Sequence, residues 1–139
     1  MTDLEIAKNN LAGHTICLCK NGECIYSDKR GIAPMMGFIA EGVDLAGCSV
    51  ADKVVGRAAA LLFVKCGISA VFGRTLSKGG KEVLEKNGIT VEYEAIADKI
   101  INRDGTDICP MEKAVGSTEN PDEAYELIKA AVEKLRAKA

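Results

Sequence analysis

Two short apolar segments on either side of one helical segment constrain the fold of this chain most strongly. Residues 68–73 and 89–93 are rich in branched and aromatic side chains, as buried strands are. Residues 77–87 lie between them, with Ser77 as a good N-cap and Gly88 as a good C-terminal stop. A strand, a helix and a second strand in this order form a βαβ unit, whose strands are parallel and whose crossover is right-handed. The chain is therefore predicted to be an α/β protein.

The N-terminal part of the chain predicts a hairpin that extends this sheet. Residues 14–19 alternate between apolar and polar side chains, residues 23–27 form a returning strand, and Asn21-Gly22 between them is the strongest two-residue hairpin signal. With the βαβ unit, the hairpin gives a mixed four-stranded sheet with helices on both faces, a three-layer α/β/α sandwich. The 139 residues fit one domain, residues 1–139, without an internal linker.

The remaining helices are predicted from their caps and their apolar faces. A capping box at residues 2–5 predicts a short helix at the start, and Pro34 opens another that ends at residue 42. A long helix is predicted over residues 52–66, with Asp52 as its N-cap. A short helix begins at Cys109-Pro110. The last helix begins after Asn120 and has an apolar stripe on one side, formed by Ala124, Leu127, Ile128, Ala131, Val132 and Leu135.

The composition and net charge of the chain argue against two kinds of binding partner, nucleic acids and membranes. The chain has 18 Lys and Arg residues and 20 Asp and Glu residues, with an isoelectric point near 5.5, so electrostatic binding to a nucleic acid is not expected. The longest apolar run, residues 58–64, is far shorter than the ~20 residues of a membrane-spanning helix. The chain also opens without the apolar segment of a secretory signal. We therefore expect a cytoplasmic protein that binds neither nucleic acid nor membrane.

The chain carries six cysteines, and the reducing cytoplasm argues against a disulfide framework. Across the predicted hairpin, however, Cys19 faces Cys24 closely enough for a disulfide. Cys17 and Cys19 share a face but lie ~6.6 Å apart along the strand, whereas one zinc ion needs sulfur atoms less than ~4 Å apart. Filling of the core is the favoured interpretation of these three cysteines, and a redox or metal role is the alternative.

The first candidate for a binding site is the segment 52–60, DKVVGRAAA. Lys53 would stand in the first turn of the predicted helix, where a cation opposes the helix dipole unless an anion is bound nearby. Gly56 and the alanines would let a ligand approach closely. The structural alternative is that Asp52 caps the helix and Gly56 allows tight packing against the sheet.

The second candidate is the segment 102–112, NRDGTDICPME. Pro110 fits the first helical position, which makes Cys109 the N-cap and places Glu112 in the first turn. A thiol at a helix N-terminus can become a nucleophile, Glu112 can act as an acid or base, and Arg103 can clamp a phosphate or carboxylate. The structural alternative is that Cys109 and Glu112 cap the helix and that Arg103 pairs with an acid.

A family resemblance covers nearly the whole chain. It rests on residues 52–64 (DKVVGRAAALLFV), on residues 102–112 and on the hairpin, which together resemble a small prokaryotic family known as domain of unknown function eighteen ninety-three. The resemblance implies a fold like that of cytidine deaminase and no established activity. Zinc deaminases carry H-x-E and P-C-x-x-C where this chain has Asp52-Lys53-Val54 and Arg74-Thr75-Leu76-Ser77. The resemblance therefore implies a pocket without zinc ligands and without a cofactor.

These residues predict a metal-free site at the carboxyl edge of the sheet, where ligands gather in open α/β sheets. Its candidate catalytic residues are Asp52, Cys109 and Glu112, and its candidate ligand-binding residues are Lys53, Gly56, Ser77, Asn102 and Arg103. The ligand predicted for it is a small anion of a nucleotide-like kind.

Two other classes of function remain open at this point. One is a non-catalytic module that senses a ligand or contacts a protein. The other is a redox or sulfur-transfer protein that uses Cys109 or the Cys19–Cys24 pair. Fold analogy also leaves open an assembly of identical subunits.

Overall fold

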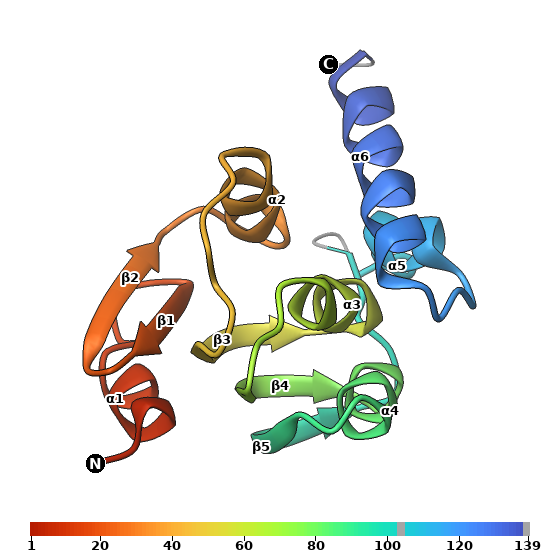
Figure 1. Ribbon diagram of the computed structural model, residues 1–139. Helices are drawn as coiled ribbons and strands as arrows, with labels where there is room; N and C mark the ends of the chain where they lie inside the picture. Colours follow the sequence, from red (N-terminus) through yellow and green to blue (C-terminus); the bar gives the residue numbers. More distant parts are fainter. Residues whose placement is uncertain (103–104, 138–139) are drawn as a thin grey trace.

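The structure, a computed structural model, describes residues 1–102 and 105–137. Its elements follow along the chain as α1 (Asp3–Asn9), β1 (Ile16–Lys20), β2 (Glu23–Ser27), α2 (Ala33–Ala40), β3 (Ser49–Val55), α3 (Arg57–Lys65), β4 (Ala70–Ser77), α4 (Lys78–Lys86), β5 (Thr90–Ala97), α5 (Pro110–Val115) and α6 (Pro121–Ala137) (Figure 1). The chain is a mixed α/β protein.

The strands form one open sheet in the order β2-β1-β3-β4-β5 (Figure 1). β1 is antiparallel to β2 and to β3, whereas β3, β4 and β5 run parallel to one another. The hairpin and the β4-α4-β5 unit are the two parts of the sheet that the sequence predicts. The sheet nevertheless has five strands and not four, because the sequence prediction assigns the second half of β3, residues 52–55, to a helix.

β3 occupies residues that were expected to form the first turns of a helix over 52–66. The helix α3 begins only at Arg57, with Gly56 as its N-cap. β3 lies in the middle of the sheet, and its residues 49–52 are buried on both faces, so this part of its sequence lacks the polar alternation of a strand with one exposed face. The branched pair Val54-Val55 favours extended backbone, whereas the alanines after Gly56 favour helix. The prediction that Asp52 is a helix N-cap is therefore wrong.

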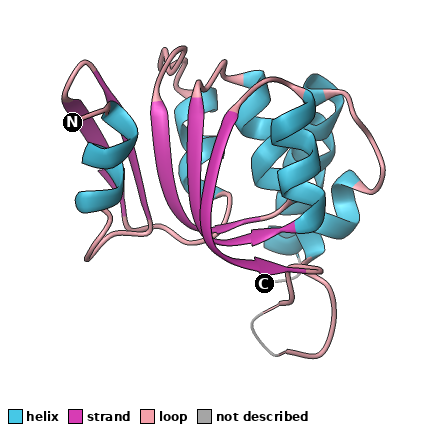
Figure 2. Ribbon diagram, turned by 90° about the horizontal axis from the view of Figure 1, so that it is seen from below, coloured by secondary structure: helices cyan, strands magenta, loops and turns pink. Residues whose placement is uncertain are grey.

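Helices lie on both faces of the sheet, as the sequence predicts (Figure 2). On one face, Leu4 of α1 and the neighbouring Leu11 pack with Cys17, Cys19 and Phe72. The other face is covered by α3 and α4, whose buried side chains share a second and larger core with side chains of α2, α5 and α6. Each of the described helices is too short or too polar to cross a membrane.

The hairpin turn has the geometry that its sequence predicts. Asn21 and Gly22 have φ values of 53° and 81°, as a tight two-residue turn between twisted strands requires. The carboxylate of Asp3 accepts hydrogen bonds from the backbone N–H groups of both turn residues, at 2.9 and 3.0 Å. These bonds fasten the start of α1 to the end of the hairpin.

The helix caps confirm several local predictions. Ser77 caps α4 by accepting a hydrogen bond from the N–H of Gly80 at 2.9 Å, and Gly88 follows the helix with φ of 73°. Asn120 accepts hydrogen bonds from the N–H groups of Asp122 and Glu123 at the start of α6. β4 and β5 extend further at their carboxyl ends than predicted, so the expected site edge lies later in both strands.

Candidate functional site

Two predicted site residues, Gly56 and Ser77, lie at the carboxyl edge of the parallel strands. β3 ends just before Gly56, and β4 ends at Ser77, so α3 and α4 begin at the same edge. A Cβ atom placed on Gly80, in the first turn of α4, would lie 3.0 Å from the carbonyl oxygen of Gly56. Glycine at position 80 therefore allows the start of α4 to lie directly against the backbone that precedes α3.

The carboxylate of Glu112, from α5, binds the N-terminus of α3 at this edge of the sheet. Its Oε1 accepts a hydrogen bond from the N–H of Arg57 and its Oε2 accepts one from the N–H of Ala58, both at 2.7 Å. The N-cap of α3 is Gly56, which has no side chain to cap the helix, so a carboxylate from another helix satisfies these N–H groups. A Cβ atom on Gly56 would overlap this carboxylate and would lie 2.8 Å from Cγ1 of Ile100.

This arrangement changes the interpretation of the predicted anion site. The N-terminus of α3 is occupied by the protein's own carboxylate, as the structural alternative for Glu112 proposed, although the helix that Glu112 caps is α3 and not its own. Lys53 lies within β3, three residues before Gly56, which at the rise of a strand is roughly 10 Å away. The prediction that Lys53 stands in the first turn of a helix is wrong.

Asp52 lies one residue earlier in β3 and is a buried acid in the middle of the sheet. It stands in register with Ile16 of β1 and Gly73 of β4, and its exposed fraction is 7%. Burial raises the pKa of the Asp52 carboxyl to about 8, although hydrogen bonds from the backbone of Lys53 and Val54 oppose the rise. The carboxyl is therefore protonated at neutral pH, and its catalytic role stays a prediction.

The segment before α5 has the predicted helix start. Cys109 is the N-cap of α5 and Pro110 occupies the first helical position. The side chain of Asn102 accepts a hydrogen bond from the N–H of Thr106 at 3.1 Å, so its observed contact is within its own loop. Arg103 lies outside the described residues, and its predicted role as an anion clamp stays a prediction.

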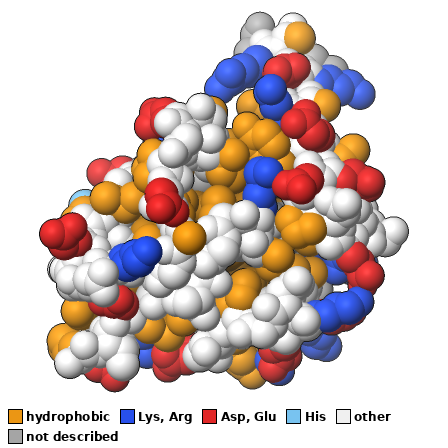
Figure 3. Space-filling view, viewed as in Figure 1, with side chains coloured by type: hydrophobic (Ala, Val, Ile, Leu, Met, Phe, Trp, Pro, Cys, Tyr) orange, Lys and Arg blue, Asp and Glu red, His pale blue; other side chains and the backbone are white. Residues whose placement is uncertain are grey.

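A groove between α2 and α6 is a concave site that the sequence prediction misses. It measures about 310 Å³ and is lined by apolar side chains that include Ile32, Met36 and Val132. Hydrophobic side chains gather on the surface between these two helices (Figure 3). Its rim carries three cations and one acid, namely Lys29, Lys129, Arg136 and Glu133. No salt bridge among the described residues involves any of these four side chains.

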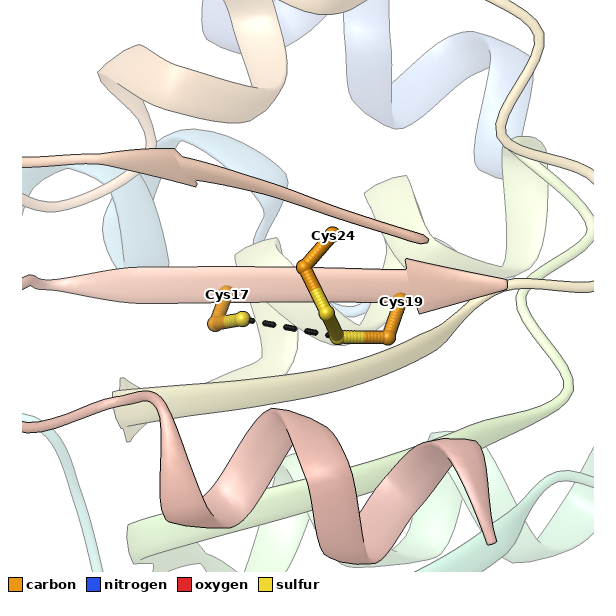
Figure 4. A group of neighbouring side chains, drawn as sticks. All are labelled: Cys17, Cys19 and Cys24. Carbon is orange, nitrogen blue, oxygen red and sulfur yellow. Dashed lines mark hydrogen bonds between the residues drawn. A yellow bond between two sulfur atoms is a disulfide. The ribbon is translucent and has the colours of Figure 1, made fainter. Parts of the chain in front are cut away.

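Three cysteines form a second cluster, on the face of the sheet that α1 covers (Figure 4). Cys19 and Cys24 are cross-strand partners with Cα atoms 4.1 Å apart, and a disulfide joins them. The favoured interpretation, that these cysteines only fill the core, is therefore wrong for this pair, because the hairpin register places the two side chains next to each other. The Sγ of Cys17 lies 3.6 Å from that of Cys19. The argument that Cys17 and Cys19 are too far apart to share an ion is therefore wrong, because their side chains lean toward each other (Figure 4).

A comparison with known protein families shows which family this chain belongs to. The model of the family described as Domain of unknown function (DUF1893) matches residues 6–132. The chain belongs to the DUF1893 family. A similar solved structure is the crystal structure of a DUF1893 family protein from Thermotoga maritima, with 25% sequence identity and a TM-score of 0.74. The match covers 87% of this chain and 80% of that chain. No curated protein matches the sequence.

Cys109 should be the fastest of the free thiols of this DUF1893 protein to be alkylated. Cys17 and Cys48 are buried, and burial raises the pKa of the thiols of Cys17, Cys48 and Cys66, which lowers their thiolate fraction. Cys109 is partly exposed. Timed labelling with iodoacetamide near neutral pH, followed by peptide mass spectrometry, measures the order. Faster labelling of Cys66 or Cys48 would contradict this ranking and remove support for a reactive Cys109.

The sequence of this DUF1893 protein indicates one wall of the groove, the one formed by α6, but not the other. Lys129, Val132 and Arg136 are spaced so that they share one face of α6, next to Tyr125 one turn earlier. That spacing predicts a mixed apolar and cationic stripe. The opposite wall is formed by α2, which lies about ninety positions earlier in the sequence, and no local pattern indicates that these two helices face each other.

Proposed function

We propose that this DUF1893 protein is a binding module for a small organic anion, which it holds in the groove between α2 and α6. One observation supports the proposal most strongly. The cations Lys29, Lys129 and Arg136 line an apolar hollow of about 310 Å³, and Glu133 is the one acid among the described residues that line it. Small-molecule sites are typically hollows of about 300–1,000 Å³, mostly apolar, with a few polar groups that fix the orientation of the ligand.

The lining defines the chemistry of the ligand. The guanidinium of Arg136 suits a carboxylate or a phosphate because it can donate two parallel hydrogen bonds, and the two lysines add positive charge. Met36, Val132 and Tyr125 offer an apolar surface for the body of the ligand. A nucleotide-like molecule combines an anionic group with a flat and largely apolar ring, and it is therefore our first choice of ligand.

We include no zinc-dependent deamination in this proposal. A cytidine-deaminase-like fold remains part of it, supported by the hairpin followed by parallel strands with connecting helices. Deaminases carry H-x-E and P-C-x-x-C at the starts of two helices. Because α3 begins at Arg57 and α4 at Lys78, the corresponding positions here are Gly56-Arg57-Ala58 and Ser77-Lys78-Gly79-Gly80, and not the segments 52–54 and 74–77 that the sequence comparison assigns. These residues supply neither imidazole nor thiolate ligands, so they do not fit a catalytic zinc ion.

A thermal-shift screen tests the groove directly. Nucleoside monophosphates, sugar phosphates and aromatic carboxylates should include a compound that raises the unfolding temperature of the wild type. A ligand at ~100 times its Kd adds ~2.7 kcal/mol of stability. The Lys129→Glu variant should lose this shift, because the substitution replaces a rim cation by an anion. The Lys134→Glu variant is the matched control, since Lys134 lies on the same helix but outside the groove.

The control separates the groove from general electrostatics. A ligand whose shift is lost in Lys129→Glu and kept in Lys134→Glu supports the proposal. Equal loss in both variants would attribute the shift to the net charge of the protein, and no loss in either would place the ligand elsewhere. The absence of any stabilising anion in the whole screen would also count against it.

A further inference from the structure

The three-cysteine cluster has the geometry of a binding site for a single ion. The Sγ atoms of Cys17, Cys19 and Cys24 all lie within 4.8 Å of one another. Cys17 and Cys19 come from the same face of β1, and Cys24 reaches the cluster from β2, so the three sulfurs form a triangle (Figure 4). Three thiolates at ~2.3 Å from a central ion in a plane are ~4 Å apart. The Sγ of Cys17 already lies 3.6 Å from that of Cys19. Reduction of the disulfide frees the Sγ atoms of Cys19 and Cys24 to separate to the same spacing by side-chain rotation.

We propose that the reduced forms of Cys17, Cys19 and Cys24 bind one soft, thiophilic metal ion of the Cu(I) class through three sulfur ligands. The site is distinct from the groove between α2 and α6, and neither proposal depends on the other. Before binding, the Cys19–Cys24 disulfide is reduced by a dithiol, which supplies two electrons and two protons and becomes a disulfide itself. The ion then displaces thiol protons to solvent and keeps its oxidation state.

The surroundings of the cluster favour a low coordination number. Among the described residues, no His, Asp or Glu joins the three cysteines. Cys17 and Cys19 are fully buried and pack with Leu4, Leu11 and Phe72, so this side of the cluster is apolar. Structural zinc sites are almost always tetrahedral and need a fourth ligand. Soft thiolate ligands select Cu(I), which fits a site with three sulfurs and no fourth donor.

The edge of the sheet gives the ion a route to the cluster. Cys24 is only partly buried because β2 is an edge strand of the sheet. An incoming ion or its carrier can therefore contact Cys24 first and then transfer to the two buried sulfurs.

The experiment is a Cu(I) titration of the full chain. The protein is reduced with dithiothreitol, freed of it under nitrogen and titrated with Cu(I) against a chromophoric chelator. We expect one equivalent of bound ion, with X-ray absorption showing three sulfur neighbours at ~2.3 Å. Cys17→Ser should reduce the number of sulfur neighbours to two and weaken binding by at least ~10-fold, within the range that loss of a supporting group costs a metal site.

Two further variants make the result decisive. Cys48→Ser is the matched control, because Cys48 is also a buried free thiol but lies in the other core. It should leave the affinity and the coordination unchanged. Cys17→Ala keeps an apolar side chain in the core, and circular dichroism checks that it is folded. It should repeat the loss seen with Cys17→Ser.

Four outcomes would overturn the proposal. One is Cu(I) binding by a folded Cys17 variant with the affinity and sulfur count of the wild type. Another is an equal loss of binding in Cys48→Ser, which would place the ion elsewhere. A third is the failure of the reduced, folded wild type to bind Cu(I). The last is tighter binding of Zn(II), with an oxygen as fourth neighbour, which would show that the site prefers a four-coordinate ion.

Discussion

Replacement of Asp52 by Asn should make the stability of this protein nearly independent of pH between about pH 4 and pH 8, where the wild type should become steadily less stable. The pKa of the carboxyl rises from 3.8 to about 8 on folding, because the group is buried in the middle of the sheet. At ~1.4 kcal/mol for each pH unit, the wild type should lose on the order of 5 kcal/mol across this range.

The direction of the effect follows from proton binding. Between the two pKa values the folded protein keeps the Asp52 proton and the unfolded chain has released it, so a rise in pH favours unfolding. Below about pH 4 both states are protonated, and above about pH 8 both are ionised, so the contribution is constant there. Asparagine has the shape of the neutral acid and cannot ionise, so the variant should be more stable than the wild type at pH 8.

Urea unfolding at several pH values measures this difference. Glu126→Gln is the control for the loss of a carboxylate, because Glu126 is exposed on α6 and, among the described residues, has no ion pair. It should follow the wild-type profile. Parallel pH profiles for Asp52→Asn and the wild type would show that the Asp52 carboxyl is ionised in the folded protein at neutral pH.

The second large effect is expected at the start of α3. Glu112→Ala should lower the free energy of unfolding by ~2–3 kcal/mol, because it removes two hydrogen bonds to a charged acceptor and leaves the N–H groups of Arg57 and Ala58 without it. Gly56→Ala should cost ~1–3 kcal/mol, because the new methyl group would displace the same carboxylate. Chemical denaturation measures both changes.

The double variant tests whether the two residues act on one contact. If Gly56→Ala acts by displacing Glu112, the double variant should be less destabilised than the sum of the single variants by ~0.5–3 kcal/mol. Gly79→Ala is a matched control, since the nearest neighbour of its added methyl group would be Cβ of Arg57 at an ordinary 3.8 Å. Strictly additive effects of the two substitutions would show that Gly56 and Glu112 stabilise the fold independently.

These two predictions separate structural roles from binding roles. If Glu112 is a cap, its loss should lower stability without changing the affinity of a ligand in the groove, which lies between α2 and α6. If Glu112 also contacts a ligand, the same variant should lower affinity at temperatures far below unfolding. The predicted roles of Asp52 and Glu112 in catalysis therefore become testable only once a ligand has been found by the screen.

Local signals predicted the parts of the fold that depend on neighbours in sequence. The turn at Asn21-Gly22 sets the register that places Cys19 opposite Cys24, and the N-caps Ser77 and Asn120 set the starts of two helices. Each of these predictions depends on interactions among residues within about five positions of one another. Such interactions have the same geometry in most folds, so a single sequence is enough to identify them.

The sequence prediction was wrong for β3 and for the start of α3, where buried residues show no regular apolar and polar pattern. Residues 49–52 of β3 have no polar alternation because both faces are covered there, and the run of apolar residues from β3 into α3 looks like one long helix. Asp52 near the start of that run resembles an N-cap, although in the structure it is a neutral acid inside the sheet. Because the helix was predicted to begin at residue 52 and not at Arg57, Lys53 was wrongly assigned to its first turn and so to the anion site.

Short-range patterns in the chain are enough to predict the α/β class, the hairpin, the β4-α4-β5 unit and the register that places Cys19 opposite Cys24. The structure adds three long-range contacts: Glu112 caps a helix 55 positions away, α2 and α6 enclose a cationic groove, and the side chain of Cys17 lies against the disulfide. These contacts join elements whose relative positions are set by packing of the whole core. No local pattern in the sequence predicts these contacts, because the residues that a side chain touches across the core are far from it in sequence.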